Sequence, residues 1–189
     1  MTWLSHNEMW EAFGTRALFW AGTGSDFGEV KNTIGRIGAG DVHDWHREWT
    51  ATAERIESIG DQCVRRKHSV GAREACIRAA TYHRTAYYPL FGPKVEPPLA
   101  ESSRREWNAM VKAAPLFDPP FEIFKIPYEN MTLPALLMRA DTANEPRPFI
   151  VHTNGYDSTV CEMLLGNALA ASRADTIVSS STGRGKPGH

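Results

Sequence analysis

The sequence has no long apolar run and no excess charge of either sign. None of its apolar stretches reaches the roughly 18–20 residues that a membrane-spanning helix needs. Its 21 basic and 22 acidic residues leave a net charge of −1 at pH 7. That balance argues against nucleic acid or an anionic membrane as the main partner. Apolar residues still make up 42% of the 189 residues, so the composition predicts a chain that folds around a core.

Cysteine is scarce, with Cys63, Cys76 and Cys161 scattered along the chain and no C-x-x-C pair. An odd number of scattered cysteines argues against a disulfide framework or a zinc site. The first 14 residues, MTWLSHNEMWEAFG, mix charged and polar residues with apolar ones, so they do not resemble a signal peptide. We therefore expect a cytoplasmic protein with no metal and no cofactor.

The first part of the chain carries apolar residues at helical spacing and predicts five helices. They are expected at residues 7–20, 25–38, 42–68, 70–91 and 98–117. Ser25 or Asp26 is expected to cap the second, Asp41 the third and Ser69 the fourth. On the fourth helix, a stripe of mostly small residues would let a neighbouring helix approach closely: Ala72, Cys76, Ala79, His83 and Tyr87.

Two histidines on the third predicted helix could suggest metal ligands. His43 and His46 lie three residues apart and could share one face of the helix. Trp45 and Trp49, however, define the buried side of this helix. We therefore interpret the face that carries the histidines as solvated.

The triplet Asp118-Pro119-Pro120 breaks helices and predicts a boundary between residues 1–117 and residues 118–189. After it, FEIFKIPYE and LPALLMRA flank a turn and predict a β-hairpin. PFIVHT then predicts a strand that is covered on both faces. A helix of about a dozen residues and the strand DTIVSS follow, and β-β-β-α-β with a parallel crossover is an α/β pattern.

Several stretches in order carry a resemblance: GTGSDFGEV, DWHREWTATAERIESI, GAREACIRAATYHRTAYYPL, FEIFKIPYENMTLPALLMRA and VHTNGYDSTVCEM. Together they resemble α/β-hydrolases that carry an N-terminal helical cap. That group includes 2,6-dihydropseudooxynicotine-hydrolase-like proteins, fermentation-respiration-switch-type esterases and fungal hydrolases that shorten polyketide chains. The resemblance implies that residues 1–117 are a helical cap. It also implies that residues 118–189 are the first strands of a truncated α/β-hydrolase sheet.

The resemblance gives a role to the turn at residues 154–157. In α/β-hydrolases the loop after the third strand supplies one backbone N–H of the oxyanion hole. Gly155 would let the backbone turn beside the substrate, and the N–H of Tyr156 would be the donor. The alternative is an ordinary strand-ending turn. Asp157 or Ser158 is expected to cap the helix that follows.

The resemblance also implies that residues of the cap line the substrate pocket. Tyr82 and Tyr87 are the candidates, from an aromatic cluster on the fourth predicted helix. Packing within the cap is the equally weighted alternative. The full-length protein would then bind a small-molecule substrate with a carbonyl or ester group, and homo-oligomerisation stays open.

Most of the catalytic machinery of such an enzyme is missing from the sequence. A serine hydrolase of this fold needs a G-x-S-x-G serine, then an acid, then a histidine. The closest string is SSSTG, and we reject Ser181 because Ser179 replaces the first glycine and no acidic residue follows. Where the family has D-G-P-G-Q-G, this chain has SSSTGRGKPGH.

We therefore expect the N-terminal part of a longer serine hydrolase that cleaves an ester or a C–C bond next to a carbonyl. This chain alone is expected to be inactive, and whether it is itself an enzyme is left open. The alternatives are a non-catalytic helical binding module and a non-functional fragment. The helices lack the fixed repeat of a true repeat array, which weighs against the helical binding module.

Overall fold

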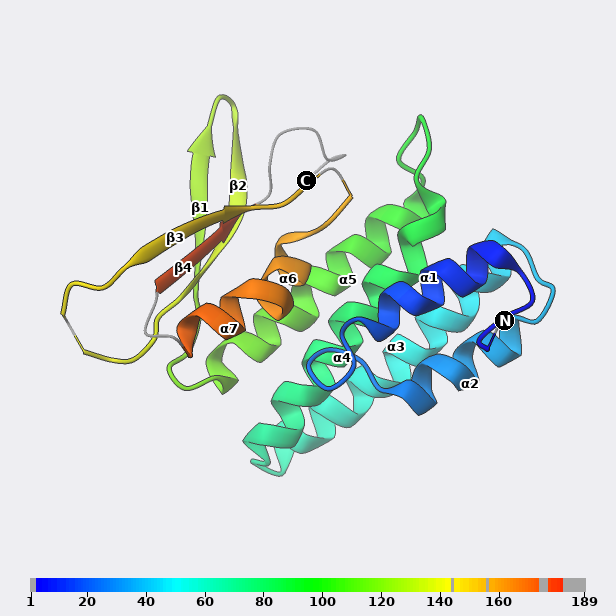
Figure 1. Cartoon of the computed structure of the whole chain (residues 1–189), viewed down its shortest axis with the longest axis horizontal. Helices are drawn as coiled ribbons and strands as arrows, with labels where there is room; N and C mark the ends of the chain where they lie inside the picture. Colours follow the sequence, from blue (N-terminus) through cyan, green and yellow to red (C-terminus); the bar gives the residue numbers. More distant parts are fainter. Residues whose placement is uncertain (1–2, 144, 156, 174–176, 182–189) are drawn as a thin grey trace. The chain divides into compact units, whose positions relative to one another are not determined.

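The computed structural model describes residues 3–143, 145–155, 157–173 and 177–181 (Figure 1). The chain forms two compact units, Met1–Ala113 and Ala114–His189. The first unit is helical, and the second contains a four-stranded sheet.

All five predicted helices are present in the first unit. They are α1 (Glu8–Leu18), α2 (Phe27–Ile37), α3 (Val42–Arg65), α4 (Ser69–Tyr87) and α5 (Pro97–Ala113), with a 3-10 turn, η1 (Tyr88–Leu90), after α4. Asp26 caps α2, and Asp41 caps α3 in a capping box with Asp44. The expected cap Ser69 is wrong. His68 occupies the N-cap position of α4 without a side-chain hydrogen bond, and Ser69 is already helical.

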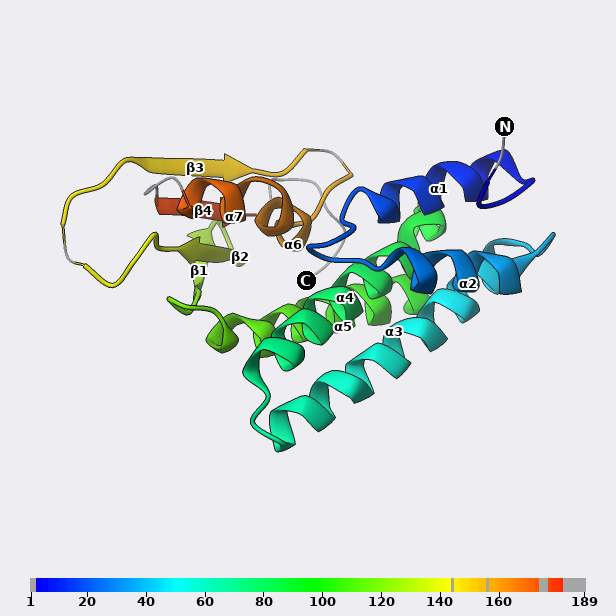
Figure 2. The same ribbon diagram turned by 60° about the horizontal axis from the view of Figure 1, so that its bottom comes forward.

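Three helices of the first unit, α3, α4 and α5, run side by side (Figure 2). The predicted small-residue stripe of α4 is buried throughout: Ala72, Cys76, Ala79, His83 and Tyr87. Cys76 and His83 lie against α3, as close approach of a neighbouring helix requires, whereas the Tyr87 hydroxyl contacts α5. A Cβ atom added to Gly60 of α3 would lie 3.2 Å from Cys76 Sγ and 3.4 Å from Ala75 Cβ. The two helix backbones are therefore close enough that glycine is the residue that fits at position 60.

A line of buried aromatic rings joins α1, α3 and α4. Ring centroids lie 4.8 Å apart for Trp10 and Trp45, 5.6 Å for Trp45 and Trp49, and 5.5 Å for Trp49 and Tyr82. Trp45 Nε1 donates to the carbonyl of Thr85 at 2.8 Å. Each ring combines a large apolar area with a fixed geometry, so this line is the core of the helical unit.

The second unit contains the predicted β-β-β-α-β order. Its strands are β1 (Glu122–Tyr128), β2 (Met131–Met138), β3 (Phe149–Thr153) and β4 (Ile177–Ser181). The sheet order is β1-β2-β4-β3. Strands β1 and β2, and β2 and β4, are antiparallel, whereas β3 and β4 are parallel. These pairings confirm the α/β fold class.

The crossover between β3 and β4 contains a helical segment from Val160 to Ser172. This segment consists of α6 (Val160–Met163), a π-helical turn, η3 (Leu164–Ala168), and α7 (Leu169–Ser172). Its buried apolar side chains are Val160, Cys161, Leu164, Leu165 and Ala168. Their spacing of three to four residues gives the helix one apolar face.

The expectation that β3 is covered on both faces is wrong for the described residues. Strand β3 lies at an edge of the sheet, and β4 pairs with one side of it. Phe149, Ile150 and Val151 are 55%, 47% and 67% exposed. The sequence pattern is that of an interior strand, but the strand occupies an edge position.

Replacing Gly60 by leucine tests the close approach of α3 and α4. We expect Gly60→Leu to lower the free energy of unfolding by about 1–3 kcal/mol, because the added side chain overpacks the helix contact. Urea unfolding followed by tryptophan fluorescence measures this change. Gly35→Leu on the exposed face of α2 is the matched control, since a Cβ there meets nothing within 4 Å. It should be neutral or stabilising, and equal losses for the two variants would contradict the close approach.

Candidate functional site

The predicted oxyanion loop follows the carboxyl end of β3. The side chain of Asn154 donates from Nδ2 to the carbonyl of Ser158 at 2.6 Å. The N–H of Gly155 donates to Ser158 Oγ at 3.0 Å. These two hydrogen bonds join the beginning of the turn, Asn154 and Gly155, to its end at Ser158. Tyr156, the predicted donor, lies outside the described residues.

Gly155 is not held in a conformation that only glycine adopts. Its φ lies outside the left-handed region, and an added Cβ would meet only Ser158 Oγ, at 3.9 Å. The space beside the backbone at this position is therefore open. Open space beside the loop would let another group approach the main chain. The role that the sequence predicted for Gly155, a tight turn of the backbone beside the substrate, stays a prediction.

Thr159, rather than Asp157 or Ser158, caps the helix after the loop. Thr159 Oγ1 accepts from the N–H of Glu162 at 3.3 Å, and Glu162 Oε2 accepts from the N–H of Thr159 at 2.9 Å. This reciprocal pair is a capping box. The expected cap at Ser158 is wrong because its hydroxyl accepts from Gly155 inside the turn. The sequence signal was present as Thr159-x-x-Glu162 just before an apolar run.

Ser181 is the last residue of β4. Its Cα partners are Ala135 of β2 and Thr153 of β3, so its backbone lies between two neighbouring strands. A nucleophile elbow instead places its serine on a sharp turn between a strand and a helix. The residues after Ser181 lie outside the described part of the chain.

Tyr82 is buried between the start of α2 and the tryptophans of α3. Its hydroxyl donates to Glu29 Oε2 at 2.6 Å and accepts from the N–H of Asp26 at 2.9 Å. Burial, together with the hydrogen bond to Glu29, raises the pKa of Tyr82 well above its usual range, so it stays a neutral donor. These contacts fix the beginning of α2 against α4, as cap packing requires.

Tyr87 lies on the same helix, but its hydroxyl contacts a different neighbour. It donates to Glu106 Oε2 of α5 at 2.5 Å. Tyr82 and Tyr87 are five residues apart, which corresponds to about 140° around a helix. The structure therefore directs the two hydroxyls to different helices.

Tyr87 belongs to an arginine–aromatic cluster that our reading of the sequence missed. The buried guanidinium of Arg84 lies 4.8 Å from the ring centroids of Tyr87 and Tyr88, and 5.6 Å from that of Phe91. Arg16 of α1 lies 4.5 Å from the Tyr88 ring and donates to its hydroxyl at 2.8 Å. Cation–π contacts of this kind are strongest where the cation is desolvated. The signal was Arg84 followed by aromatic residues three, four and seven positions later.

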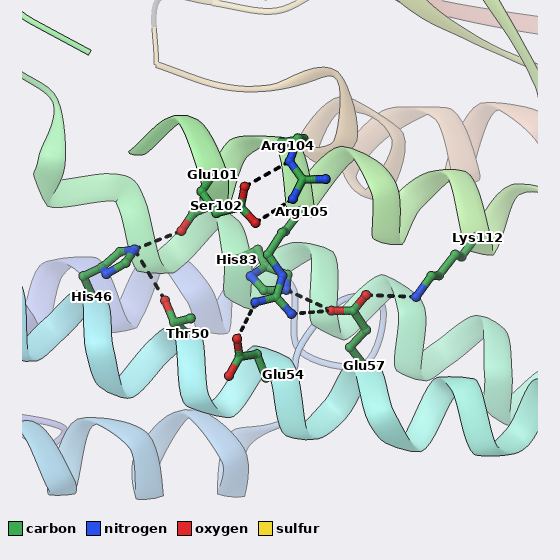
Figure 3. A network of polar contacts seen from close by, with 10 residues as sticks. All are labelled: His46, Thr50, Glu54, Glu57, His83, Glu101, Ser102, Arg104, Arg105 and Lys112. Carbon is green, nitrogen blue, oxygen red and sulfur yellow. Dashed lines mark hydrogen bonds and ion pairs between the residues drawn. The ribbon is translucent and has the colours of Figure 1, made fainter. Parts of the chain in front are cut away.

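A second polar cluster joins α3, α4 and α5 around Glu57 (Figure 3). Arg105 Nη2 and His83 Nε2 lie 2.9 Å and 3.4 Å from Glu57 Oε2, and Lys112 Nζ lies 2.9 Å from Oε1. Arg105 also pairs with Glu54, and Lys112 with Asp61 at 3.1 Å. This cluster was also missed, although its acids and bases recur at helical spacing on α3 and α5.

The Glu57 cluster sets two pKa values far from their ordinary range. Burial alone would raise the pKa of Glu57, but hydrogen bonds from Lys112, Arg105 and His83 lower it from 4.5 to about 2. Burial, reinforced by Arg105, lowers the pKa of His83 from 6.5 to about 4. Glu57 is therefore ionised and His83 neutral at pH 7. Neither can exchange protons readily near neutrality, so we interpret the cluster as structural.

The neutral His83 has a defined tautomer in this cluster. A carboxylate only accepts, so Nε2 must carry the proton that faces Glu57. Nδ1 is then a buried acceptor, and it has no hydrogen-bond partner among the described residues. Burying this nitrogen without a partner costs free energy, which is offset by the ion pairs that hold the three helices together.

The two histidines of α3 have different surroundings. His46 Nε2 lies 2.9 Å from Ser102 Oγ of α5 and 3.4 Å from Thr50 Oγ1. His46 is half-buried, so our interpretation of a solvated face is wrong there. Among residues 3–143, 145–155, 157–173 and 177–181, no group of three or more His, Cys, Asp or Glu side chains could hold a metal ion. Within the same ranges, no helix has the length and apolar character to cross a membrane.

His83 should make the helical unit sensitive to acid. Its folded-state pKa is below its unfolded-state value, so the unfolded chain binds more protons between pH 6.5 and 4 and stability falls as pH falls. We expect His83→Phe to remove about 2 kcal/mol of the stability loss between pH 8 and pH 5. Urea unfolding at several pH values measures this difference.

His43→Phe, at an exposed position of α3, is the control for His83→Phe. It should leave the pH dependence unchanged. Burial also lowers the pKa of His46, so more than one histidine contributes to the pH dependence of stability in the wild type. His83→Phe should therefore remove only part of that dependence. Unchanged pH dependence in His83→Phe would show that His83 is not held neutral.

Comparison with known proteins places this arrangement among hydrolases, although no family model matches the chain. The chain is 32% identical over 152 residues to 20-hydroxy-prefusarin hydrolase FUS2 of Gibberella moniliformis, covering 78% of this chain and 36% of that protein. It is 35% identical over 155 residues to alpha/beta hydrolase pydG of Acremonium sp, covering 79% of this chain and 36% of that protein. The chain thus spans about a third of the length of these curated relatives, and the match covers their N-terminal portion.

Solved structures show the same fold. The 2,6-dihydroxy-pseudo-oxynicotine hydrolase aligns with a TM-score of 0.71 at 19% identity, covering 88% of this chain and 44% of that one. AbyA5 aligns with a TM-score of 0.55 at 20% identity, covering 84% of this chain and 41% of the other. The predicted resemblance to hydrolases, limited to their N-terminal portion, is confirmed.

Proposed function

We propose that this chain, which belongs to the α/β-hydrolases and matches their N-terminal portion, supplies the cap and the oxyanion loop of a serine hydrolase. The proposal assigns residues 1–117 to the cap and residues 118–189 to an incomplete hydrolase core. The observation that carries it is the closed turn after β3, joined directly to a capped helix. The whole protein would be cytoplasmic, in keeping with three scattered cysteines.

The turn would act on the carbonyl oxygen of the substrate. When a serine Oγ adds to the carbonyl carbon, negative charge develops on that oxygen, and a backbone N–H fixed in advance stabilises it. The N–H of Gly155 is already used by Ser158, so the next one, on Tyr156, is the proposed donor. One such donor contributes roughly 3–4 kcal/mol to lowering the barrier. The serine, acid and histidine would come from the rest of the hydrolase.

The substrate would be a small molecule with an ester, or a C–C bond next to a carbonyl. Among the predicted cap residues, Tyr87 is the better candidate for contacting it, because it belongs to the cluster of Arg84 and Tyr88. That cluster offers both flat aromatic surface and positive charge. Tyr82 is the weaker candidate, since its ring belongs to the buried line with Trp49, whereas the ring of Tyr87 lies 5.8 Å from that of the exposed Phe91.

The isolated chain should show no serine-hydrolase chemistry. We expect no hydrolysis of a p-nitrophenyl ester above background and no covalent labelling by a fluorophosphonate probe, because no G-x-S-x-G elbow is present. Intact-mass and peptide mass spectrometry detect the label. Labelling at Ser181 would contradict the assignment of the nucleophile to the remainder of the hydrolase.

The oxyanion role of Tyr156 can be tested in a fused enzyme. The chain would replace the matching N-terminal portion of the Gibberella hydrolase. Tyr156→Pro removes the N–H, and we expect it to lower kcat by about 10²–10³-fold. Tyr156→Phe keeps the N–H and is the matched control, which should retain kcat. An active Tyr156→Pro fusion would rule out this donor.

A further inference from the structure

The turn between α3 and α4 is a cluster of positive charge at one end of the helical unit (Figure 2). Residues 64–70, which form the turn and the ends of the two helices, are all exposed. The stretch from residue 62 to residue 73 contains no acidic residue, and its basic side chains with a permanent charge are Arg65, Arg66, Lys67 and Arg73. The whole chain has a net charge of −1, so this turn is a local departure from a balanced composition.

Three adjacent cations of this turn lack a counter-charge. Most cations of the described residues lie in ion pairs, as Arg105 does, or over aromatic rings, as Arg84 does. Within the part of the chain that the structure describes, the side chains of Arg65, Arg66 and Lys67 have neither kind of contact. Adjacent like charges repel one another, and an anionic partner would remove that repulsion.

The first turn of α4 adds partial positive charge at the same place. A helix begins with N–H groups that have no partner within the helix, and they form the positive end of the helix dipole. Helices α1, α2 and α3 each begin with a capping side chain and an acidic residue in the first turn. Helix α4 has neither, and its N-cap residue is His68. The dipole of α4 therefore reinforces the three cations instead of being offset by a neighbouring carboxylate.

The composition of the turn favours a polypeptide over a membrane or a nucleic acid. Basic clusters that bind anionic lipid hold about 4–8 cations, and interfacial helices carry Trp, Phe or Leu. Surfaces that bind single strands place aromatic rings among the cations. Residues 62–73 contain no aromatic residue, and the exposed apolar side chains of the turn are Val64 and Val70, 50% and 56% exposed. Carboxylates beside a small apolar residue match this surface in both charge and size.

We infer that residues 64–70 bind an acidic segment of a partner polypeptide. Its carboxylates pair with Arg65, Arg66 and Lys67, and an adjacent apolar side chain packs on Val64 or Val70. Exposed ion pairs are individually weak and are screened by salt, so the affinity depends on several pairs that form together. This surface belongs to the helical unit alone, and the inference does not rest on the proposed function.

A labelled peptide tests the inference on the 189-residue chain. The probe is a fluorescein-labelled peptide in which Asp-Glu pairs flank a leucine, and the control peptide has Asn-Gln pairs instead. Fluorescence anisotropy measures both dissociation constants. We expect the acidic peptide to bind at least about tenfold more tightly than the control peptide at low salt, and this difference to shrink as salt is added. Equal binding of the two peptides would overturn the inference.

Charge reversal tests the turn itself. Arg65→Glu with Arg66→Glu should raise the dissociation constant of the acidic peptide at least about tenfold, because two attractive charges become repulsive. Lys94→Glu with Lys125→Glu is the matched control, since both positions are exposed and the net charge changes by the same amount. It should bind nearly as well as the wild type. Equal losses for the two variants would assign the binding to overall charge and overturn the inference.

A milder pair of substitutions keeps the test valid if charge reversal disturbs the end of α3. Arg65→Gln with Arg66→Gln removes the charges without adding repulsion and should weaken binding by a smaller factor. Circular dichroism and urea unfolding check that each variant is folded. A folded Gln variant that binds the acidic peptide as tightly as the wild type would place the contact elsewhere.

The other anionic partners are separate outcomes. Vesicles of phosphatidylcholine and phosphatidylserine, and a DNA duplex, are titrated with the same variants. If either binds in a manner that depends on Arg65 and Arg66 while the acidic peptide does not, the turn belongs to that partner and the inference is overturned. Failure of all three probes to bind at low salt would also overturn it.

Discussion

The parallel ladder between β3 and β4 is the constraint on which the second unit depends. Its register runs from Phe149 opposite Ile177 to Thr153 opposite Ser181. Because the two strands are parallel, a crossover must return the chain from one end of the sheet to the other, and α6, η3 and α7 perform that return. The ladder thereby fixes where the crossover begins. The closed turn at Asn154–Ser158 is the short piece of chain between the ladder and that helix.

The helical unit depends on a different kind of constraint, the close contact of α3 with α4. Small residues bring the two backbones together, and this leaves little room for polar side chains at the contact. His83 consequently lies in the interior as a neutral imidazole, and Glu57 keeps its charge only because Arg105 and Lys112 reach it from α5. Removing Arg105 or Lys112 would leave the partly buried carboxylate of Glu57 with fewer compensating charges. The helix packing of this unit and the charge states of His83 and Glu57 therefore depend on each other.

Local patterns in the sequence were enough to predict most of the fold. The five helices followed from apolar spacing, and the hairpin and crossover followed from alternation and turn residues. The errors came where two local signals competed. Ser158 and Thr159 are both residues that commonly cap helices. Thr159 is the cap because the Ser158 hydroxyl already accepts a hydrogen bond from the N–H of Gly155. The apolar run of β3 predicted a strand covered on both faces, and this was wrong for the described residues because an apolar pattern does not show whether a strand lies at an edge of the sheet.

The candidate site was less predictable than the fold. The turn at residues 154–157 was found because a family resemblance pointed to it, and spacing alone left an ordinary turn equally acceptable. The Arg84 and Glu57 clusters were missed because they join residues from separate helices, and a single sequence does not show which helices are neighbours. Tyr82 and Tyr87 were correctly placed on one helix. Their different hydroxyl partners, Glu29 and Glu106, again depended on tertiary contacts.

The exposed apolar edge strand β3 also bears on how this chain would fare in a cell. A net charge of −1 provides little electrostatic repulsion between copies, and an apolar strand edge provides a place for them to adhere. Chaperones and proteases act on exposed surface of this kind. Because these proteins act on the exposed edge, the chain would be removed faster than one whose strand edges are all paired or covered.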